Sequence, residues 1–170
     1  MKEYLYFGII LILFLCACRR PEKYSDIPEI KFISFEKNKK EQISEGGKLV
    51  FRFQDGDGDL GLNDTDISHP FDTLSYYHYN LFIDYYEKQN GIFVKIDSIE
   101  NKDGQLIPFN LNARFPRLST LPKESIDGEI THIMKSYRVP TSKFDTIQLR
   151  FFIVDRKLNH SNTEVVEIIR

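Results

Sequence analysis

Residues 48–54 alternate between apolar and mostly polar side chains, and this stretch restricts the fold of the chain more than any other. Leu49, Phe51 and Phe53 occupy every second position within it. Successive side chains of a β-strand point to opposite faces, so the pattern predicts a strand with one face against a core. No stretch after residue 18 shows a helical period of comparable length. The chain is therefore expected to be all-β.

Other stretches also have strand character, and turn signals such as Gly46-Gly47 and Asn90-Gly91 separate them. The predicted strands cover residues 29–35, 48–54, 79–87, 92–99, 106–111, 128–139, 145–154 and 163–169. The chain also contains 14 Phe and 9 Tyr, residue types that favour strands. Seven to eight such strands predict a single immunoglobulin-like antiparallel β-sandwich over residues 29–170. Residues 112–127 are expected to form a long excursion over the surface.

An immunoglobulin-like strand order has a consequence for two aspartates. In that order the strands at 48–54 and 145–154 point the same way, so Asp55 and Asp155, which directly follow them, are expected at the same end of the sandwich. An alternative for Asp155 needs no ligand. It would form an Asx-type turn with Asn159, whose short polar side chain tolerates the left-handed conformation.

The acidic loop, residues 54–66, carries Asp55, Asp57 and Asp59 at alternate positions with glycines between them. Asp64 and Asp66 follow within the same loop. Exposed carboxylates in close pairs repel by about 1 kcal/mol each in water. Ca²⁺ turns this repulsion into binding, because it takes about six to eight oxygen ligands in a flexible shell. The glycines allow the backbone to curl through positive φ.

The acidic loop is not an EF-hand. Its acids match the template at several positions, but Leu60 stands where the template requires glycine, and no flanking helices are predicted. We expect a Ca²⁺ site all the same, with Asp155 contributing to the shell. The predicted metal ligands are Asp55, Asp57, Asp59, Asp64, Asp66 and Asp155. An ion-free Asp/Gly turn and a magnesium or catalytic divalent site are the alternatives.

The N-terminus begins with a charged residue, Lys2, and an apolar run over residues 4–15. This run is shorter than the roughly 20 residues that span a bilayer, and it suits a signal peptide. It ends in Leu15-Cys16-Ala17-Cys18, which resembles the lipobox of bacterial lipoproteins. The resemblance implies a signal peptide over residues 1–17, a lipid on Cys18 and a tether up to residue 28. An uncleaved anchor is the alternative.

Two further motifs resemble a group of small Bacteroidetes lipoproteins. One is Phe-Gln-Asp-Gly-Asp-Gly-Asp-Leu-Gly at residues 53–61, and the other is Asp-Arg-x-x-Asn-x-Ser-Asn at residues 155–162. The resemblance implies an immunoglobulin-like fold and an outer-membrane location, and it implies no reaction. Arg19-Arg20 lacks the acidic run associated with surface export, which favours the periplasmic side.

Charge and motifs narrow the function further. The net charge of −2 leaves no basic footprint for nucleic acid, and no nucleophile elbow, P-loop or dinucleotide fingerprint occurs, so we expect no enzyme. Tyr76, Tyr77 and Tyr79 follow the acidic loop and are predicted to contact a partner, with core packing as the alternative. The expected function is a non-catalytic lipoprotein that binds an envelope protein or a glycan. A divalent-dependent hydrolase and a purely structural envelope subunit are the alternatives.

Overall fold

The computed structural model describes residues 24–38, 46–119, 121, 124–139 and 141–169. The predicted signal peptide, Cys18 and the first part of the tether lie outside these residues. The elements are β1 (Glu29–Lys37), β2 (Gly47–Asp55), the 3-10 turn η1 (Tyr76–His78), β3 (Leu81–Gln89), β4 (Ile92–Lys95), β5 (Ser98–Glu100), β6 (Leu106–Pro108), β7 (Ile126–Met134), β8 (Thr146–Ile153) and β9 (Glu164–Ile169). Within the described ranges, no helix has the length and apolar character needed to cross a membrane.

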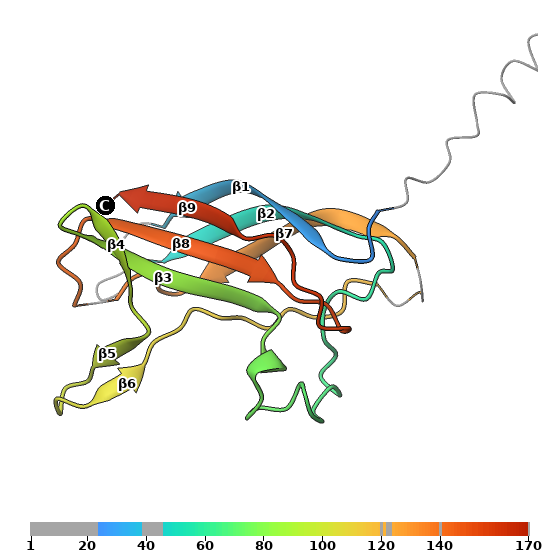
Figure 1. Cartoon of the computed structure of the whole chain (residues 1–170), viewed down its shortest axis with the longest axis horizontal. Coiled ribbons are helices and arrows are strands. Elements are labelled where there is room, and N and C mark those ends of the chain that lie inside the picture. The colour runs from blue at the N-terminus through green and yellow to red at the C-terminus, as the bar shows by residue number, and fades with distance from the viewer. Residues whose placement is uncertain (1–23, 39–45, 120, 122–123, 140, 170) are drawn as a thin grey trace, which may run out of the picture.

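Two antiparallel sheets make up the body of the protein. One has the strand order β1-β2-β7 and the other has the order β4-β3-β8-β9. Figure 1 shows the two sheets stacked on each other, while the β5-β6 hairpin projects away from them. The predicted all-β class and antiparallel sandwich are confirmed.

The core lies between the two sheets and follows from the alternation in their strands. Leu49 and Phe51 of β2 are fully buried, as are Leu149 and Phe151 of β8. The rings of Phe51 and Phe151 lie 5.3 Å apart and join the two sheets. Each fully buried side chain of this size contributes about 1.5–3 kcal/mol through the hydrophobic effect. Burial of these side chains between the sheets therefore stabilises the sandwich.

The strands predicted at 106–111 and 128–139 end early, at Pro108 and Met134. Two segments differ from the sequence-based expectation by more than their bounds. The strand predicted at 92–99 is divided, because pairing with β3 ends at Lys95 and the chain then leaves the sheet to pair with β6. The excursion predicted at 112–127 is wrong in its first half. Residues 113–118, which we call the strap, run along the acidic loop: the Leu62 and Leu118 amides donate to the carbonyls of Phe115 and Leu60, both at 3.2 Å. These hydrogen bonds join backbone groups, so no pattern of side chains in the sequence predicts them.

Candidate metal centre

The acidic loop leaves the end of β2 and is fastened to the core by two leucines. Leu60 is fully buried and Leu62 is 3% exposed. The position at which the EF-hand template requires glycine is Leu60 here, and the Leu60 side chain packs in the core. Gly58 supplies the bend that the loop needs, with φ of +66°, and a Cβ there would collide with the carbonyl oxygen of Glu124. A side chain at this position would therefore force the loop away from Glu124.

Three carboxylates meet at this end of the sandwich. Ligand oxygens of Asp55, Asp59 and Asp155 all lie within 4.8 Å of one another. Asp55 ends β2 in one sheet, and Asp155 follows β8 in the other. Asp55 is fully buried and Asp155 is 2% exposed. The structure thus brings Asp155 beside the acidic loop, as the shared direction of the two strands predicts.

The Asx-type turn at Asp155 is also present. The backbone and side-chain amides of Asn159 donate to the two carboxylate oxygens of Asp155, each at 2.8 Å. The left-handed residue is Leu158, with φ of +67°, and the expectation that Asn159 takes this conformation is wrong. The backbone of Asn159 is hydrogen-bonded to Asp155 through both its amide and its carbonyl, so the left-handed residue of the turn is the one before Asn159. The turn orients Asp155 toward the cluster, so the turn and the cluster coexist.

The acidic loop leaves several buried oxygens without a hydrogen-bond donor. The Asp59 amide donates to Asp55 Oδ2 at 2.9 Å, which satisfies one oxygen. Within the described part of the chain, Oδ1 of Asp55, Asp57 and Asp59 is buried and has no partner. Buried polar groups in proteins are nearly always satisfied, and an unpaired buried charge is costly. A bound cation or bound protons would remove this cost.

The pKa values of the cluster reflect the same crowding. Burial, followed by the charges of Asp57 and Asp59, raises the pKa of Asp55 from 3.8 to about 7. Burial, followed by the charge of Asp155, raises the pKa of Asp59 to about 6. The pKa of Asp155 is also raised, chiefly by burial. The folded protein therefore resists ionising this cluster unless a cation joins it.

Two cationic side chains offset part of this charge. Lys157 forms an ion pair with Asp57, and its own side chain is 57% exposed. Arg117 donates from Nη2 to the Gly58 carbonyl at 3.3 Å. Both charges act to lower the pKa of Asp59, yet this pKa stays raised, because burial and the neighbouring carboxylates outweigh them. Lys157 is a flexible surface cation that a metal ion could displace.

Three predicted ligands lie outside the group of Asp55, Asp59 and Asp155. Asp57 is close enough for its charge to raise the pKa of Asp55 and Asp59, whereas Asp64 and Asp66 lie apart, contrary to the predicted ligand set. Asp66 is bound in a bidentate pair by Arg156, with one bond at 3.0 Å, and it also accepts the Asn63 amide at 2.7 Å. The Arg156 guanidinium lowers the pKa of Asp66. Asp64 is exposed and lines, with Asp66, a separate cavity of about 250 Å³. Asp66 is directed to Arg156 because the fold places this guanidinium beside it.

Arg114 is a residue that the sequence did not single out. It holds residues 63–80, which we call the tyrosine lobe and which run from the last residues of the acidic loop to the start of β3. Its guanidinium donates to four backbone carbonyls of the lobe, those of Asn63 (2.8 Å), Asp66 (3.0 Å), Phe71 (3.3 Å) and His78 (2.9 Å). Arg114 belongs to the strap, so one side chain joins the strap to the whole lobe. No sequence pattern marks an arginine whose partners are backbone groups.

The predicted partner-binding tyrosines lie outside the core. Tyr76 is 61% exposed, and its ring stacks on Phe82 at a centroid distance of 4.6 Å. Tyr77 packs edge-on against Tyr76, and its hydroxyl lies 3.3 Å from Nε2 of His160. Tyr79 is half-buried against His78. Core packing, the alternative interpretation for these residues, is not what the structure shows.

No protein-family model matches the chain, and neither does any curated protein or any solved structure. A functional proposal for this chain therefore depends on its own side chains and their geometry.

Proposed function

We propose that the acidic loop binds one Ca²⁺ through Asp55, Asp57, Asp59 and Asp155, and that the protein is a non-catalytic lipoprotein of the bacterial envelope. A lipid on Cys18 anchors it to the outer membrane, on the periplasmic side, and its calcium-stabilised end holds a surface that binds an envelope protein or a glycan. The observation that carries the metal site is the buried Asp55 carboxylate. Its Oδ1 has no donor among the described residues, and two more carboxylates lie within 4.8 Å.

The donor set favours Ca²⁺ over other divalent ions. The cluster offers carboxylate oxygens alone, whereas zinc prefers nitrogen and sulfur ligands. Mg²⁺ requires a near-ideal octahedron and keeps several waters, which suits a rigid site. Here three ligands lie on a glycine-containing loop and the fourth lies on another strand end, an arrangement that adapts to the flexible shell of Ca²⁺.

A cation at this place would stabilise more than the loop. Asp55 and Asp155 end strands of opposite sheets, so an ion bound to both would fasten the two sheets at this end. The tyrosine lobe begins within the last residues of the loop, and Arg114 and Arg156 bind these shared residues through Asn63 and Asp66. An ordered loop therefore fixes the position of Tyr76, and this connects the metal site to the exposed aromatic surface.

The fold and anchor parts of the proposal have separate support. Matching strands in chain order to the immunoglobulin letters gives A-B-E for one sheet and C′-C-F-G for the other, which supports an immunoglobulin-like topology. The anchor rests on the lipobox resemblance at Leu15–Cys18. Labelling cells with radioactive palmitate tests it: the wild-type chain is expected to take up label and Cys18→Ser is not.

Thermal unfolding with and without Ca²⁺ tests the metal site. With a Kd of about 10⁻⁴ M and about 10 mM Ca²⁺, mass action stabilises the folded state by about 2.7 kcal/mol. For a domain of this size that corresponds to a rise in Tm of about 5–10 °C. Asp57→Ala combined with Asp59→Ala is expected to abolish the rise, whereas Asp64→Ala, an exposed position outside the cluster, keeps it. A wild-type protein whose Tm does not respond to Ca²⁺ would overturn the proposal.

A further inference from the structure

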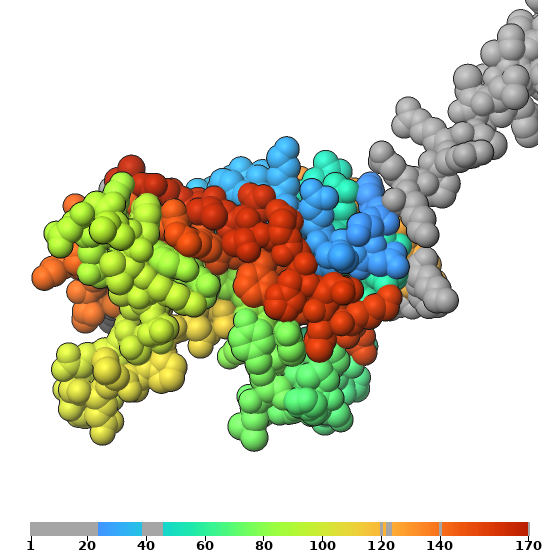
Figure 2. All heavy atoms as spheres, in the orientation of Figure 1, coloured from blue at the N-terminus to red at the C-terminus, as the bar shows by residue number. Residues whose placement is uncertain are grey.

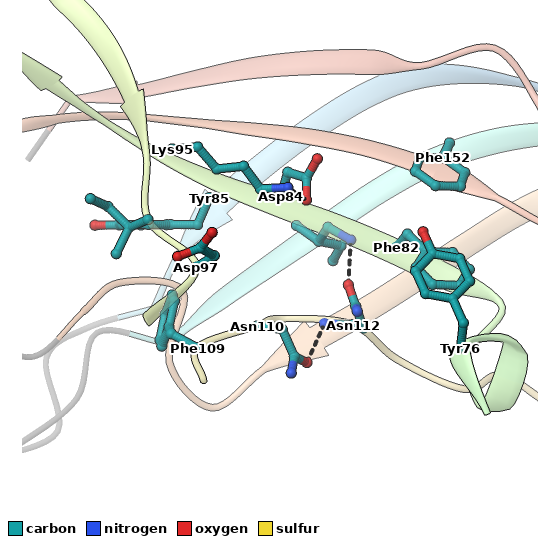
Figure 3. Close-up of a pocket in the computed structure, with 12 residues that line it drawn as sticks. Tyr76, Phe82, Asp84, Tyr85, Lys95, Asp97, Phe109, Asn110, Asn112 and Phe152 are labelled. Atoms are coloured by element: carbon teal, nitrogen blue, oxygen red, sulfur yellow. Dashed lines mark hydrogen bonds and ion pairs between the residues drawn. The ribbon is translucent and has the colours of Figure 1, made fainter. Parts of the chain in front are cut away.

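A cleft opens along β3, and none of the residues that line it belongs to the acidic loop. It has a volume of about 260 Å³ and lies over β3. Figure 2 shows a hollow in the surface between the tyrosine lobe and the β5-β6 hairpin, and Figure 3 shows the side chains at the base of this hollow. Tyr76, Phe82 and Phe152 form one side, and Asp97, Phe109 and Asn110 form the other.

The first side is a continuous aromatic stack. The Tyr76 ring lies 4.6 Å from that of Phe82 at an interplanar angle of 17°, and Phe82 lies 5.0 Å from Phe152 at 11°. Phe82 is 4% exposed whereas Tyr76 is 61% exposed. The stack therefore fixes the orientation of the Tyr76 ring while leaving most of its surface open to the cleft and to solvent.

The opposite side carries polar groups beside Phe109. Asp97 and Asn110 are exposed, so their carboxylate and carboxamide groups are open to a ligand. Asn110 is oriented by the Asn112 amide, which donates to its Oδ1 at 3.3 Å, and Asn112 in turn accepts the Ile83 amide at 2.9 Å (Figure 3). Lys95 and Asp84 line the cleft as well and form an ion pair of 2.7 Å. Donors and acceptors thus face an aromatic plane across a small space.

We infer that this cleft binds a pyranose ring of a glycan. The inference rests on the proposed function as a binding module and specifies the class of ligand and the site. A pyranose has a face of C–H groups and a rim of hydroxyls. The C–H face suits the exposed Tyr76 ring, and pairs of adjacent hydroxyls suit the carboxylate of Asp97 and the carboxamide of Asn110. The volume lies just below the lower limit of about 300 Å³ for drug-sized pockets, which fits one ring.

Other ligand classes fit less well. A peptide that binds by strand addition needs a free sheet edge. At the base of the cleft β3 is paired with β8 on one side, and on its other side the Ile83 amide donates to Asn112 and the Tyr85 carbonyl accepts the Ile96 amide. An anionic ligand would face two carboxylates, Asp84 and Asp97, with Lys95 as the lining cation. A neutral ligand that combines an apolar face with many hydroxyls agrees with both observations.

Nuclear magnetic resonance tests the inference on the full chain, kept in a detergent without a sugar headgroup. D-glucose, D-galactose, D-mannose and N-acetyl-D-glucosamine are titrated separately to about 50 mM, because single-ring sites often bind in the millimolar range. At least one sugar is expected to shift the side-chain amides of Asn110 and Asn112 in a saturable way. Tyr76→Ala is expected to weaken this binding at least about tenfold, and Asn110→Ala at least about threefold. Leu74→Ala, a 97% exposed position of the same lobe outside the cleft, keeps it.

Two results would overturn the inference: no sugar shifts the cleft resonances, or Tyr76→Ala binds as the wild type does. Amide dispersion of the Tyr76→Ala spectrum shows whether that variant is folded, and Asn110→Ala decides the question if it is not. The titrations are run with Ca²⁺ and with chelator. A protein that Ca²⁺ stabilises but that binds no sugar loses this inference and keeps its metal site. A protein that binds sugar but is not stabilised by Ca²⁺ keeps this inference and loses its metal site.

Discussion

Asp55→Asn is expected to stabilise the protein when divalent ions are absent and to remove most of its stabilisation by Ca²⁺. The two effects have opposite signs because the same carboxylate destabilises the folded protein when no ion is bound and acts as a ligand when Ca²⁺ is present. Asp55 is fully buried, and one of its oxygens has no donor within the described residues. Asparagine has nearly the same shape, and its carbonyl oxygen can still accept the Asp59 amide that now bonds to Oδ2.

The pKa of Asp55 sets the magnitude. This pKa rises from 3.8 to about 7, chiefly through burial and then through the charges of Asp57 and Asp59. One pKa unit corresponds to about 1.4 kcal/mol, so ionising Asp55 in the folded protein costs at most about 4 kcal/mol. Replacing a charged acceptor by a neutral one for the Asp59 amide loses about 1 kcal/mol. We expect Asp55→Asn to raise the free energy of unfolding by about 1–3 kcal/mol near pH 8 with chelator present.

Urea unfolding followed by circular dichroism measures both effects, and this probe suits a chain without Trp. With about 10 mM Ca²⁺ the wild type is expected to gain about 2.7 kcal/mol and Asp55→Asn less than about 0.5 kcal/mol. Asp66→Asn is the matched control. It breaks the pair with Arg156, costs about 1 kcal/mol with or without Ca²⁺, and leaves the gain from Ca²⁺ unchanged. If Asp55→Asn destabilises the chelated protein near pH 8, the reasoning from the buried charge is wrong.

Three further outcomes follow from the same geometry. Because the pKa values of Asp55 and Asp59 are raised, the folded chain binds more protons than the unfolded chain between about pH 4 and about pH 7. The chelated protein should therefore lose stability as the pH rises through this window, while its affinity for Ca²⁺ rises. Urea midpoints that increase with pH in the presence of chelator would contradict this. Lys157→Met removes the cation that pairs with Asp57 and should tighten Ca²⁺ binding about fivefold by calorimetry, and an unchanged or weaker affinity would show that Lys157 does not compete with the ion. Arg114→Ala removes the guanidinium that donates to four carbonyls of the tyrosine lobe and should cost about 2–3 kcal/mol. Hydrogen exchange is then expected to be faster at residues 63–80 than in β2 and β8, and uniform exchange would show that the lobe needs no such support.

The sequence predicted those features that depend on local pattern. Alternation located β2 and β8, because the pleat of a strand sends every second side chain into the core. The position of Asp155 beside the acidic loop required a strand order in addition, and an immunoglobulin-like order supplied it. Sequence reasoning could therefore predict that Asp155 lies close to Asp55 and Asp59.

The remaining features depend on contacts between distant segments. An aspartate can face an ion or a guanidinium equally well, and only the fold decides that Asp66 faces Arg156. The strap has no alternation because it bonds to the backbone of the acidic loop, and Arg114 is hidden for the same reason. The cleft beside Tyr76 lies along β3, between the tyrosine lobe and the β5-β6 hairpin. No single stretch of sequence predicts that these two segments lie on either side of it.

Calorimetric titration of Ca²⁺ into the chelator-treated wild-type chain near pH 7.5 tests the metal site most directly, because it counts ions and measures affinity without reference to stability. The structure predicts a single site per chain with a Kd at or below about 10⁻³ M, and loss of that binding in Asp55→Asn. A titration that shows no saturable binding up to about 10 mM Ca²⁺ would contradict the account, and the acidic loop would then be an ion-free turn that holds its buried carboxyls partly protonated.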